Sequence, residues 1–360
     1  MSDSRKLFWW SISIVGGTTI GAGIFALPVT FHQSGWLIAL AWLVGLSIAL
    51  AALHAAYYQA LVRTGNKMGL LELVRSRLGP LAGTAGLLAI ICGNLLTLFI
   101  YLQLGSAFVE TLLPGLLGWP ALLLLWVVST LPLFIGIRRF ARAEAVGTLL
   151  LVGIVLLLAV LAPDLTFRGE PRVNLAAAFL PFGAILFALT GWTAVEPVAV
   201  LRRKYARTSF GAPGMFAVSA AVVAVVYAIF AAAILGFGSE SSSLVRTIAF
   251  CGLTAIWTSY VPVGREVLRS LREGARIPEF ATDLAVALLP LLLAIAFRSA
   301  DVIRTIGFVG GLFLAIQYVL LALVVRSVLR PSGFKSWLLT LAAAAFAAAA
   351  VCELYFFMLG

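Results

Sequence analysis

Apolar segments long enough to cross a lipid bilayer recur along the whole of this 360-residue chain. A membrane-spanning helix needs about 20 consecutive, mostly apolar residues. Eleven such segments cover residues 7–31, 35–62, 80–112, 119–136, 143–162, 174–201, 213–237, 243–268, 283–298, 302–325 and 336–358. Backbone polar groups inside a bilayer must bond within their own segment, so these segments are predicted to be helices. The expected fold is therefore an all-α integral membrane protein with about 11 transmembrane helices.

Composition supports this prediction, because 62% of the residues are hydrophobic and 11% are charged. An average soluble domain is nearer to half apolar and a quarter charged, and it could not hide so much apolar surface from water. The three cysteines all lie inside apolar segments, so no disulfide framework is expected. No small-residue cleavage site follows the N-terminus, and no removable signal peptide is expected. Membrane lipid is the expected surrounding of the chain.

The distribution of basic residues predicts the orientation of the chain across the membrane. Of the 25 lysines and arginines, 20 fall in loops on one side of the predicted spans and five fall on the other. Because Lys and Arg are retained on the cytoplasmic side, a multi-pass protein of the cell (inner) membrane with a cytoplasmic N-terminus and an outside C-terminus is expected. The net charge of +11 does not indicate nucleic-acid binding, since no basic surface is interleaved with stacking aromatic residues.

Two of the spans are interrupted. The first contains Gly16–Pro28, with four glycines in eight residues, and the sixth contains Leu189–Pro197, in which Glu196 precedes a proline. Glycine makes a regular helix costly, and unwound backbone at membrane depth is tolerated only where it is buried in protein or lines a cavity. Freed N–H groups at a helix end form a site for an anion such as a carboxylate.

Interrupted spans at corresponding places in two halves of a chain point to a secondary transporter built from inverted repeats. The predicted division is a first five-helix repeat over residues 1–165, a second, inverted repeat over 166–330, and an additional C-terminal helix over 331–360. The alternative for the glycines is close helix packing. The second broken span favours a binding site over packing. The glycine-rich run Gly16–Pro28 is not a nucleotide-binding motif. No strand precedes it, as a dinucleotide fingerprint requires, and it lacks the Gly-Lys-Ser/Thr of a P-loop.

The run Gly17–Pro28 resembles the first-helix signature of amino acid permeases of the amino acid/polyamine/organocation superfamily. It is closest to the aromatic amino acid permease and amino acid/auxin permease families. Thr258–Tyr260 and Gly307–Gly311 resemble later segments of these families. Such permeases are similar to LeuT-type transporters, so the resemblance implies a five-plus-five inverted repeat with helices 1 and 6 broken.

The resemblance implies that the backbone of Thr19–Gly23 binds a substrate carboxylate, and that carbonyls around Leu189–Trp192 take the amino group. Asn94, Thr97 and Tyr101 share one helical face and would either form a pocket wall or hydrogen bond between helices. Trp192 would either gate the substrate or pack against a neighbouring helix. The predicted substrate-binding residues are Thr18, Thr19, Gly21, Ala22, Gly23, Asn94, Tyr101, Leu189, Thr190, Gly191 and Trp192.

The sequence offers two candidates for the coupling ion, Na⁺ and a proton. Oxygens of Gly16, Thr258 and Ser259 would ligate Na⁺. Glu196 would instead carry a coupling proton, because an intramembrane carboxylate is functional by default. Its alternative role is as a partner of Arg202 or Arg203.

The predicted function is cation-coupled symport of an amino acid, aromatic or otherwise large and neutral, by alternating access. The alternative is a transporter or exchanger of another small organic solute. An enzyme is not expected, because the sequence has two histidines and no metal pair or nucleophile with a base, and no cofactor is expected. A channel would need a polar selectivity ring, which the spans lack.

Overall fold

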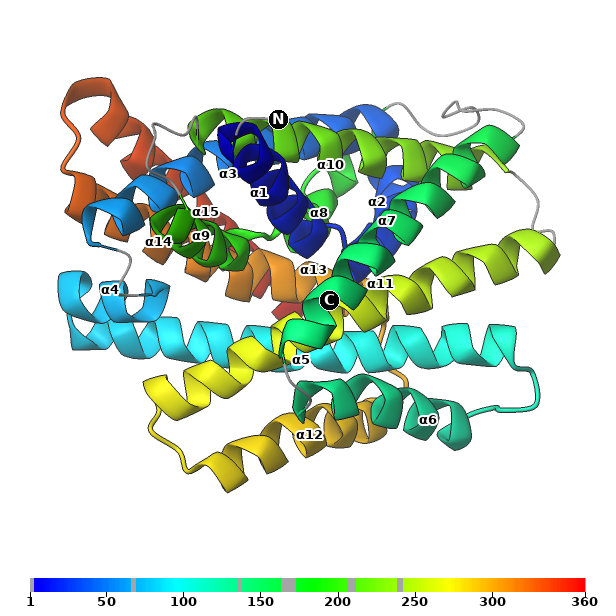
Figure 1. The fold of residues 1–360 in the computed structure, drawn as a ribbon. Coiled ribbons are helices and arrows are strands. Elements are labelled where there is room, and N and C mark those ends of the chain that lie inside the picture. The colour runs from blue at the N-terminus through cyan, green and yellow to red at the C-terminus, as the bar shows by residue number, and fades with distance from the viewer. Residues whose placement is uncertain are drawn as a thin grey trace.

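The computed structural model describes residues 3–65, 69–134, 137–162, 173–205, 212–237 and 242–359. Within these ranges the chain is helical and has no β-strand (Figure 1). The first half forms α1 (Asp3–Thr19), α2 (Leu27–Ser34), α3 (Trp36–Arg63), α4 (Leu70–Leu78), α5 (Pro80–Leu112), α6 (Trp119–Thr130) and α7 (Ile137–Leu161). The second half forms α8 (Leu180–Leu189), α9 (Val195–Tyr205), α10 (Ala212–Gly236), α11 (Ser242–Arg269), α12 (Glu279–Ala296), α13 (Val302–Phe308), α14 (Ala315–Leu329) and α15 (Gly333–Leu359).

The apolar spans follow one another in the order that the sequence predicts. In the described residues, eight helices are long and apolar enough to cross a bilayer. The bent pair Phe8–Thr19 and Ala22–Ser34 adds one span, and the shorter apolar helices Trp119–Phe134 and Val146–Leu161 match the predicted fourth and fifth spans. The predicted all-α fold with about 11 membrane helices is confirmed.

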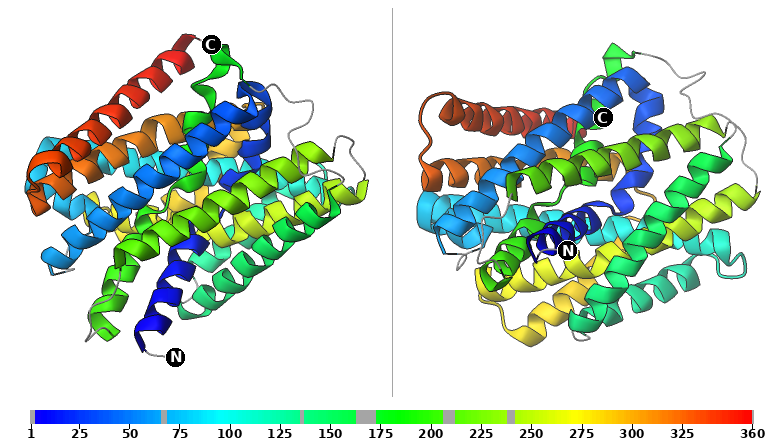
Figure 2. Two further views of the ribbon diagram at one scale, coloured as in Figure 1. Left: turned by 90° about the horizontal axis from the view of Figure 1, so that it is seen from above. Right: turned by 45° about the horizontal axis from the view of Figure 1, so that its top comes forward.

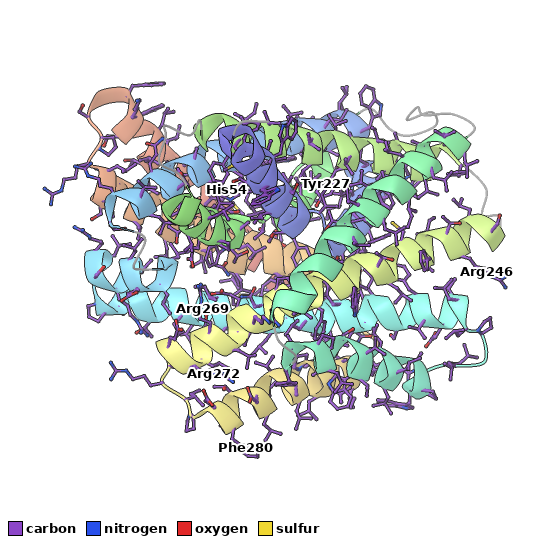
Figure 3. All side chains as sticks on the ribbon, viewed as in Figure 1. His54, Tyr227, Arg246, Arg269, Arg272 and Phe280 are labelled. Carbon is purple, nitrogen blue, oxygen red and sulfur yellow. The ribbon has the colours of Figure 1, made fainter. Side chains whose placement is uncertain are left out.

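Most of the long helices run across the molecule in roughly one direction, so their ends gather at two opposite faces (Figures 1 and 2). Figure 3 shows Arg246, near the start of α11, at one face, and Arg269 and Arg272 near the other. An α-helix of 28 residues such as α11 is roughly 42 Å long at 1.5 Å per residue. That length exceeds the bilayer hydrocarbon core of about 30 Å.

The outer helices present apolar side chains to their surroundings. Only 22% of the most apolar stretch of α15 is buried, and its exposed side chains include Val351, Tyr355, Phe356 and Met358. A soluble monomer rarely exposes a contiguous apolar surface of this kind. The chain is therefore a multi-pass membrane protein whose outer helices contact lipid.

Close backbone contact holds the sixth span against the tenth. A Cβ atom at Gly183 of α8 would collide with the carbonyl oxygen of Gly307, and one at Gly310 would collide with the carbonyl oxygen of Gly183. Gly310 belongs to a π-helical turn, Val309–Leu314, which joins α13 to α14. These contacts fix the position of α8, which ends at the break of the sixth span.

We expect Gly310→Ala to lower the thermal unfolding temperature of the purified protein. The added methyl group overlaps backbone atoms that cannot rotate away, and such overpacking costs about 1–3 kcal/mol. Gly45→Ala on α3 is the matched control, because no atom lies within 4 Å of its Cβ position. Equal unfolding temperatures for the two variants would contradict the described contact.

Candidate functional site

The first span is broken as the glycine-rich run predicts. Helix α1 ends at Thr19, a 3-10 turn covers Ala22–Ala26, and the two halves of the span meet at 49°. Gly21 has an extended backbone that any residue can adopt, so space rather than conformation requires glycine there. A Cβ atom at Gly21 would lie 2.5 Å from the Ser259 hydroxyl oxygen and 3.9 Å from that of Tyr101.

The sixth span is interrupted as well, by a 3-10 turn within the candidate span Leu180–Leu201. Helix α8 ends at Leu189, and a 3-10 turn over Trp192–Ala194 precedes α9. Thr190, between them, donates its hydroxyl to the carbonyl oxygen of Leu186 at 2.7 Å. Since the last carbonyls of a helix lack N–H partners, this bond satisfies one of the groups that the break frees.

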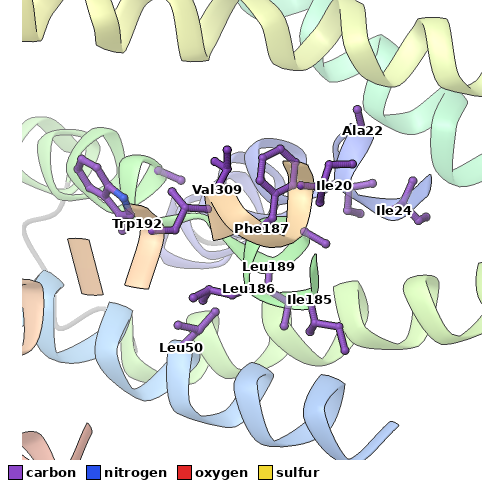
Figure 4. Packing of buried hydrophobic residues seen from close by; sticks show 14 of the residues in the cluster. Ile20, Ala22, Ile24, Leu50, Ile185, Leu186, Phe187, Leu189, Trp192 and Val309 are labelled. Atoms are coloured by element: carbon purple, nitrogen blue, oxygen red, sulfur yellow. The ribbon is translucent and has the colours of Figure 1, made fainter. Parts of the chain in front are cut away.

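The two breaks lie against each other in opposite directions. A Cβ atom at Gly23 would lie 2.7 Å from the Cα atom of Ala188, and one at Gly191 would touch the hydroxyl oxygen of Thr19. The later residue of the first break therefore meets the earlier residue of the second. Figure 4 shows the buried apolar side chains packed around this crossing, from Ile20 and Ala22 of the first span to Phe187 and Leu189 of the sixth.

One buried hydroxyl group forms hydrogen bonds with both breaks. Tyr227 of α10, labelled in Figure 3, places its hydroxyl oxygen 2.7 Å from the carbonyl oxygen of Thr19 and 2.8 Å from that of Ala188. Its single proton is shared between these two acceptors. Because both carbonyls lie at helix ends, the bond satisfies groups that the interruption would otherwise leave unpaired.

A cavity of about 80 Å³ adjoins the crossing. That is several times the 10–15 Å³ that one water molecule requires. The cavity wall includes ten of the predicted site residues: Thr18, Thr19, Gly21, Gly23, Asn94, Tyr101, Thr190, Trp192, Thr258 and Ser259, and Thr97 joins them. The predicted residues that do not line it are Gly16, Ala22, Leu189, Gly191 and Glu196.

The polar groups of the wall differ in how well they are paired. The indole nitrogen of Trp192 donates to Gln317 at 2.8 Å, and Gln317 in turn donates to the carbonyl oxygen of Ala89 at 3.1 Å. Trp192 is therefore fixed in place. The side-chain amide nitrogen of Asn94 is buried and has no hydrogen-bond partner among the described residues. It offers a free donor to a ligand in the cavity.

The predicted sodium ligands are not all brought to the cavity. Thr258 and Ser259 lie on its wall, and the Thr258 hydroxyl donates to carbonyl oxygens of its own helix at Thr254 and Ala255. The Cβ position of Gly16 faces the hydroxyl of Ser219 on α10 at 3.6 Å.

Glu266 brings a carboxylate to the wall, and the sequence prediction missed it. It follows Ser259 by seven residues, which is nearly two helical turns, so both lie on one face of α11. This spacing is the feature of the sequence from which Glu266 could have been predicted as a site residue. Glu196, which was predicted instead, lies away from the wall and pairs with Arg269 at 2.7 Å. The side chains of Arg202 and Arg203 lie outside the described part of the structure.

Comparison with known proteins agrees with this geometry. Residues 4–177 match the model of the tryptophan/tyrosine permease family. No curated protein sequence matches the chain. Among solved structures, MhsT in complex with L-phenylalanine has a TM-score of 0.69 at 14% identity, covering 97% of this chain and 97% of MhsT.

The chain shares its fold with two further solved structures. A mutant of the Eremococcus coleocola manganese transporter gives a TM-score of 0.65 at 13% identity, over 98% of this chain and 87% of that one. Mhp1, a nucleobase-cation-symport-1 family transporter, gives a TM-score of 0.57 at 14% identity. The match covers 95% of this chain and 90% of Mhp1. The LeuT-like architecture with helices 1 and 6 broken is confirmed.

We expect Tyr227→Phe to destabilise the protein by about 1–3 kcal/mol, because two buried carbonyls lose their shared donor. The measurement is thermal unfolding in detergent. Tyr260→Phe is the control, since that buried hydroxyl lies 3.4 Å from Thr130 and touches neither break. An equal loss of stability in both variants would show that Tyr227 has no special role in holding the breaks.

Proposed function

We propose that the protein is a cation-coupled symporter of an amino acid, aromatic or otherwise large and neutral, that works by alternating access. The observation that carries the proposal is the crossing of two broken helices beside one polar cavity. No covalent chemistry is needed for this function, because binding and conformational change suffice.

The helix ends at the crossing suit a zwitterion. The turn Ala22–Ala26 begins at the break, and the N-terminal end of a helical turn carries partial positive charge. Such an end favours the carboxylate of an amino acid. The C-terminal end of α8 presents carbonyl groups and partial negative charge, which favour an ammonium group. The Gly23–Ala188 contact brings these two ends together, so one small ligand would reach both.

The rest of the wall suits a large side chain. Tyr101, Phe187 and Trp192 line the cavity, and aromatic rings pack well against one another in offset or edge-on arrangements. The tryptophan/tyrosine permease match over residues 4–177 and the phenylalanine bound to MhsT support the same substrate class. The free amide of Asn94 would bond to a polar group of the substrate.

Alternating access would use the two predicted repeats, residues 1–165 and 166–330, with 331–360 as an added helix. The opposite directions of the two breaks agree with an inverted repeat. In this proposal the N-terminus is cytoplasmic and the C-terminus is outside. The coupling ion is Na⁺ at Gly16, Thr258 and Ser259, or a proton on an intramembrane carboxylate such as Glu196 or Glu266.

The test is thermal stabilisation of the purified protein by each of the twenty amino acids, with and without Na⁺, at two pH values. A ligand at 100 times its Kd adds about 2.7 kcal/mol, which raises the unfolding temperature by about 5 °C. We expect this shift from an aromatic amino acid. A response to organic solutes other than amino acids would favour the alternative substrate class.

Asn94→Leu provides the site-specific variant for this panel. We expect its ligand-induced shift to disappear, while its unfolding temperature without ligand stays level or rises because a buried unpaired donor is removed. Leu88→Ala on the exposed surface of the same helix is the control and should keep the full shift. A full shift in Asn94→Leu would place the binding site elsewhere.

A further inference from the structure

Two carboxylates share one guanidinium at the end of the bundle where α9 and α11 meet. The Arg269 side chain donates through Nη1 to Glu196 at 2.7 Å and through Nη2 to Glu266 at 2.9 Å. The carboxylate side chains are well buried, with 13% exposure for Glu196 and 12% for Glu266. Figure 3 shows Arg269 at the face of the molecule that also carries Arg272.

The charges of this trio do not balance. Two carboxylates and one guanidinium leave one negative charge among the three side chains. An uncompensated charge in a buried place is costly. Carboxylates that share a site resolve this cost when one of them takes up a proton.

The two carboxylates differ in their hydrogen bonds. Glu196 accepts bonds from the Tyr57 hydroxyl of α3 at 2.9 Å and from the backbone N–H of Leu70 of α4 at 3.0 Å, in addition to Arg269. Glu196 therefore has three hydrogen-bond donors around its carboxylate. Glu266 has Arg269 and a weaker contact from the Ser270 hydroxyl at 3.4 Å. The proton therefore belongs on Glu266.

Glu266 also has access to the transport site. It lines the cavity at the two breaks, whereas Glu196 does not. The other titratable side chain on the described wall is Tyr101, on α5. A hydronium ion in the cavity could pass a proton to the Glu266 carboxylate: one O–H bond of the hydronium breaks, one O–H bond forms on the carboxyl group, and a water molecule is left. A Na⁺ ion would instead be repelled by the guanidinium that lies against this carboxylate.

We propose that Glu266 is the coupling-proton site and that Arg269 transmits its protonation to α9, the second half of the broken sixth span. A neutral Glu266 holds Arg269 less strongly, because a charged pair becomes an ordinary hydrogen bond. The ion pair with Glu196 of α9 then becomes the stronger of the two contacts of Arg269. The proposal rests on the transport function proposed above, and it assigns the ion and the residue that couples it.

The test uses proteoliposomes that contain wild-type protein, Glu266→Gln, or the control Glu353→Gln, which replaces a carboxylate of α15 outside the trio. With the amino acid that stabilises the wild type best, we expect an imposed pH gradient to drive accumulation in wild type and in Glu353→Gln. Accumulation by Glu266→Gln should fall at least tenfold. This variant should still exchange external for internal substrate, since exchange needs no net proton movement.

A second measurement needs no substrate. A proton held by Glu266 in the folded protein, and released from the unfolded chain at neutral pH, makes stability fall as pH rises. We therefore expect the unfolding temperature of the wild type to fall between pH 6 and pH 8 by more than that of Glu266→Gln. An equal fall in both proteins would overturn the assignment even if the substrate class were wrong.

Two further results would overturn the proposal. One is full accumulation by Glu266→Gln under the same pH gradient. The other is accumulation in wild type that requires a Na⁺ gradient and ignores the pH gradient. If wild type binds and exchanges no amino acid while the pH-dependent stability difference persists, the substrate assignment fails and the proton site stands.

Discussion

The hydroxyl of Tyr227 holds together the ends of two broken helices inside a membrane protein. Each break frees backbone groups that lipid cannot pair. Tyr227 bonds to one carbonyl from each break, and its side chain is fully buried. The bond explains why two interruptions, which would each weaken a lone helix, coexist at a single crossing. Residues of both breaks, among them Gly21, Gly23 and Thr190, line a cavity where a ligand can bind.

The helices around the crossing pack in close contact with one another. Gly183 and Gly310 bring α8 against the π-helical turn of the tenth span. Gln317, from the same span, holds the indole of Trp192. The tenth span therefore positions one side of the cavity, while α11 supplies Ser259 and Glu266 on the other. Through Arg269, α11 also contacts α9, so the cavity wall and the end of the bundle are joined by one chain of polar contacts.

The sequence predicts local interruptions well and pairings between helices poorly. Spans follow from about 20 apolar residues in a row, and the breaks follow from clustered glycines and a proline, so both were confirmed. Tyr227 sits in the apolar run from Val222 to Leu235, where nothing marks one aromatic residue as a clamp. Its role depends on which helices the fold places beside α10.

Glu196 illustrates the same limit. It stood out as a carboxylate beside a break, yet its oxygens are taken up by Tyr57, Leu70 and Arg269 from three other helices. Glu266 was overlooked because it lies close to the basic end of α11, where a carboxylate is expected to reach water. The helical spacing from Ser259 was present in the sequence, but only the fold shows that Ser259 faces Gly21.

The central claim is that the crossing binds the carboxylate and the ammonium group of one amino acid. The most direct test is calorimetric binding of L-tryptophan, of tryptamine, which lacks the carboxylate, and of indole-3-propionate, which lacks the ammonium group. We expect L-tryptophan to bind and each analogue to bind at least 100-fold more weakly, because each leaves one set of helix-end groups unpaired. Equal affinity for L-tryptophan and either analogue would contradict it.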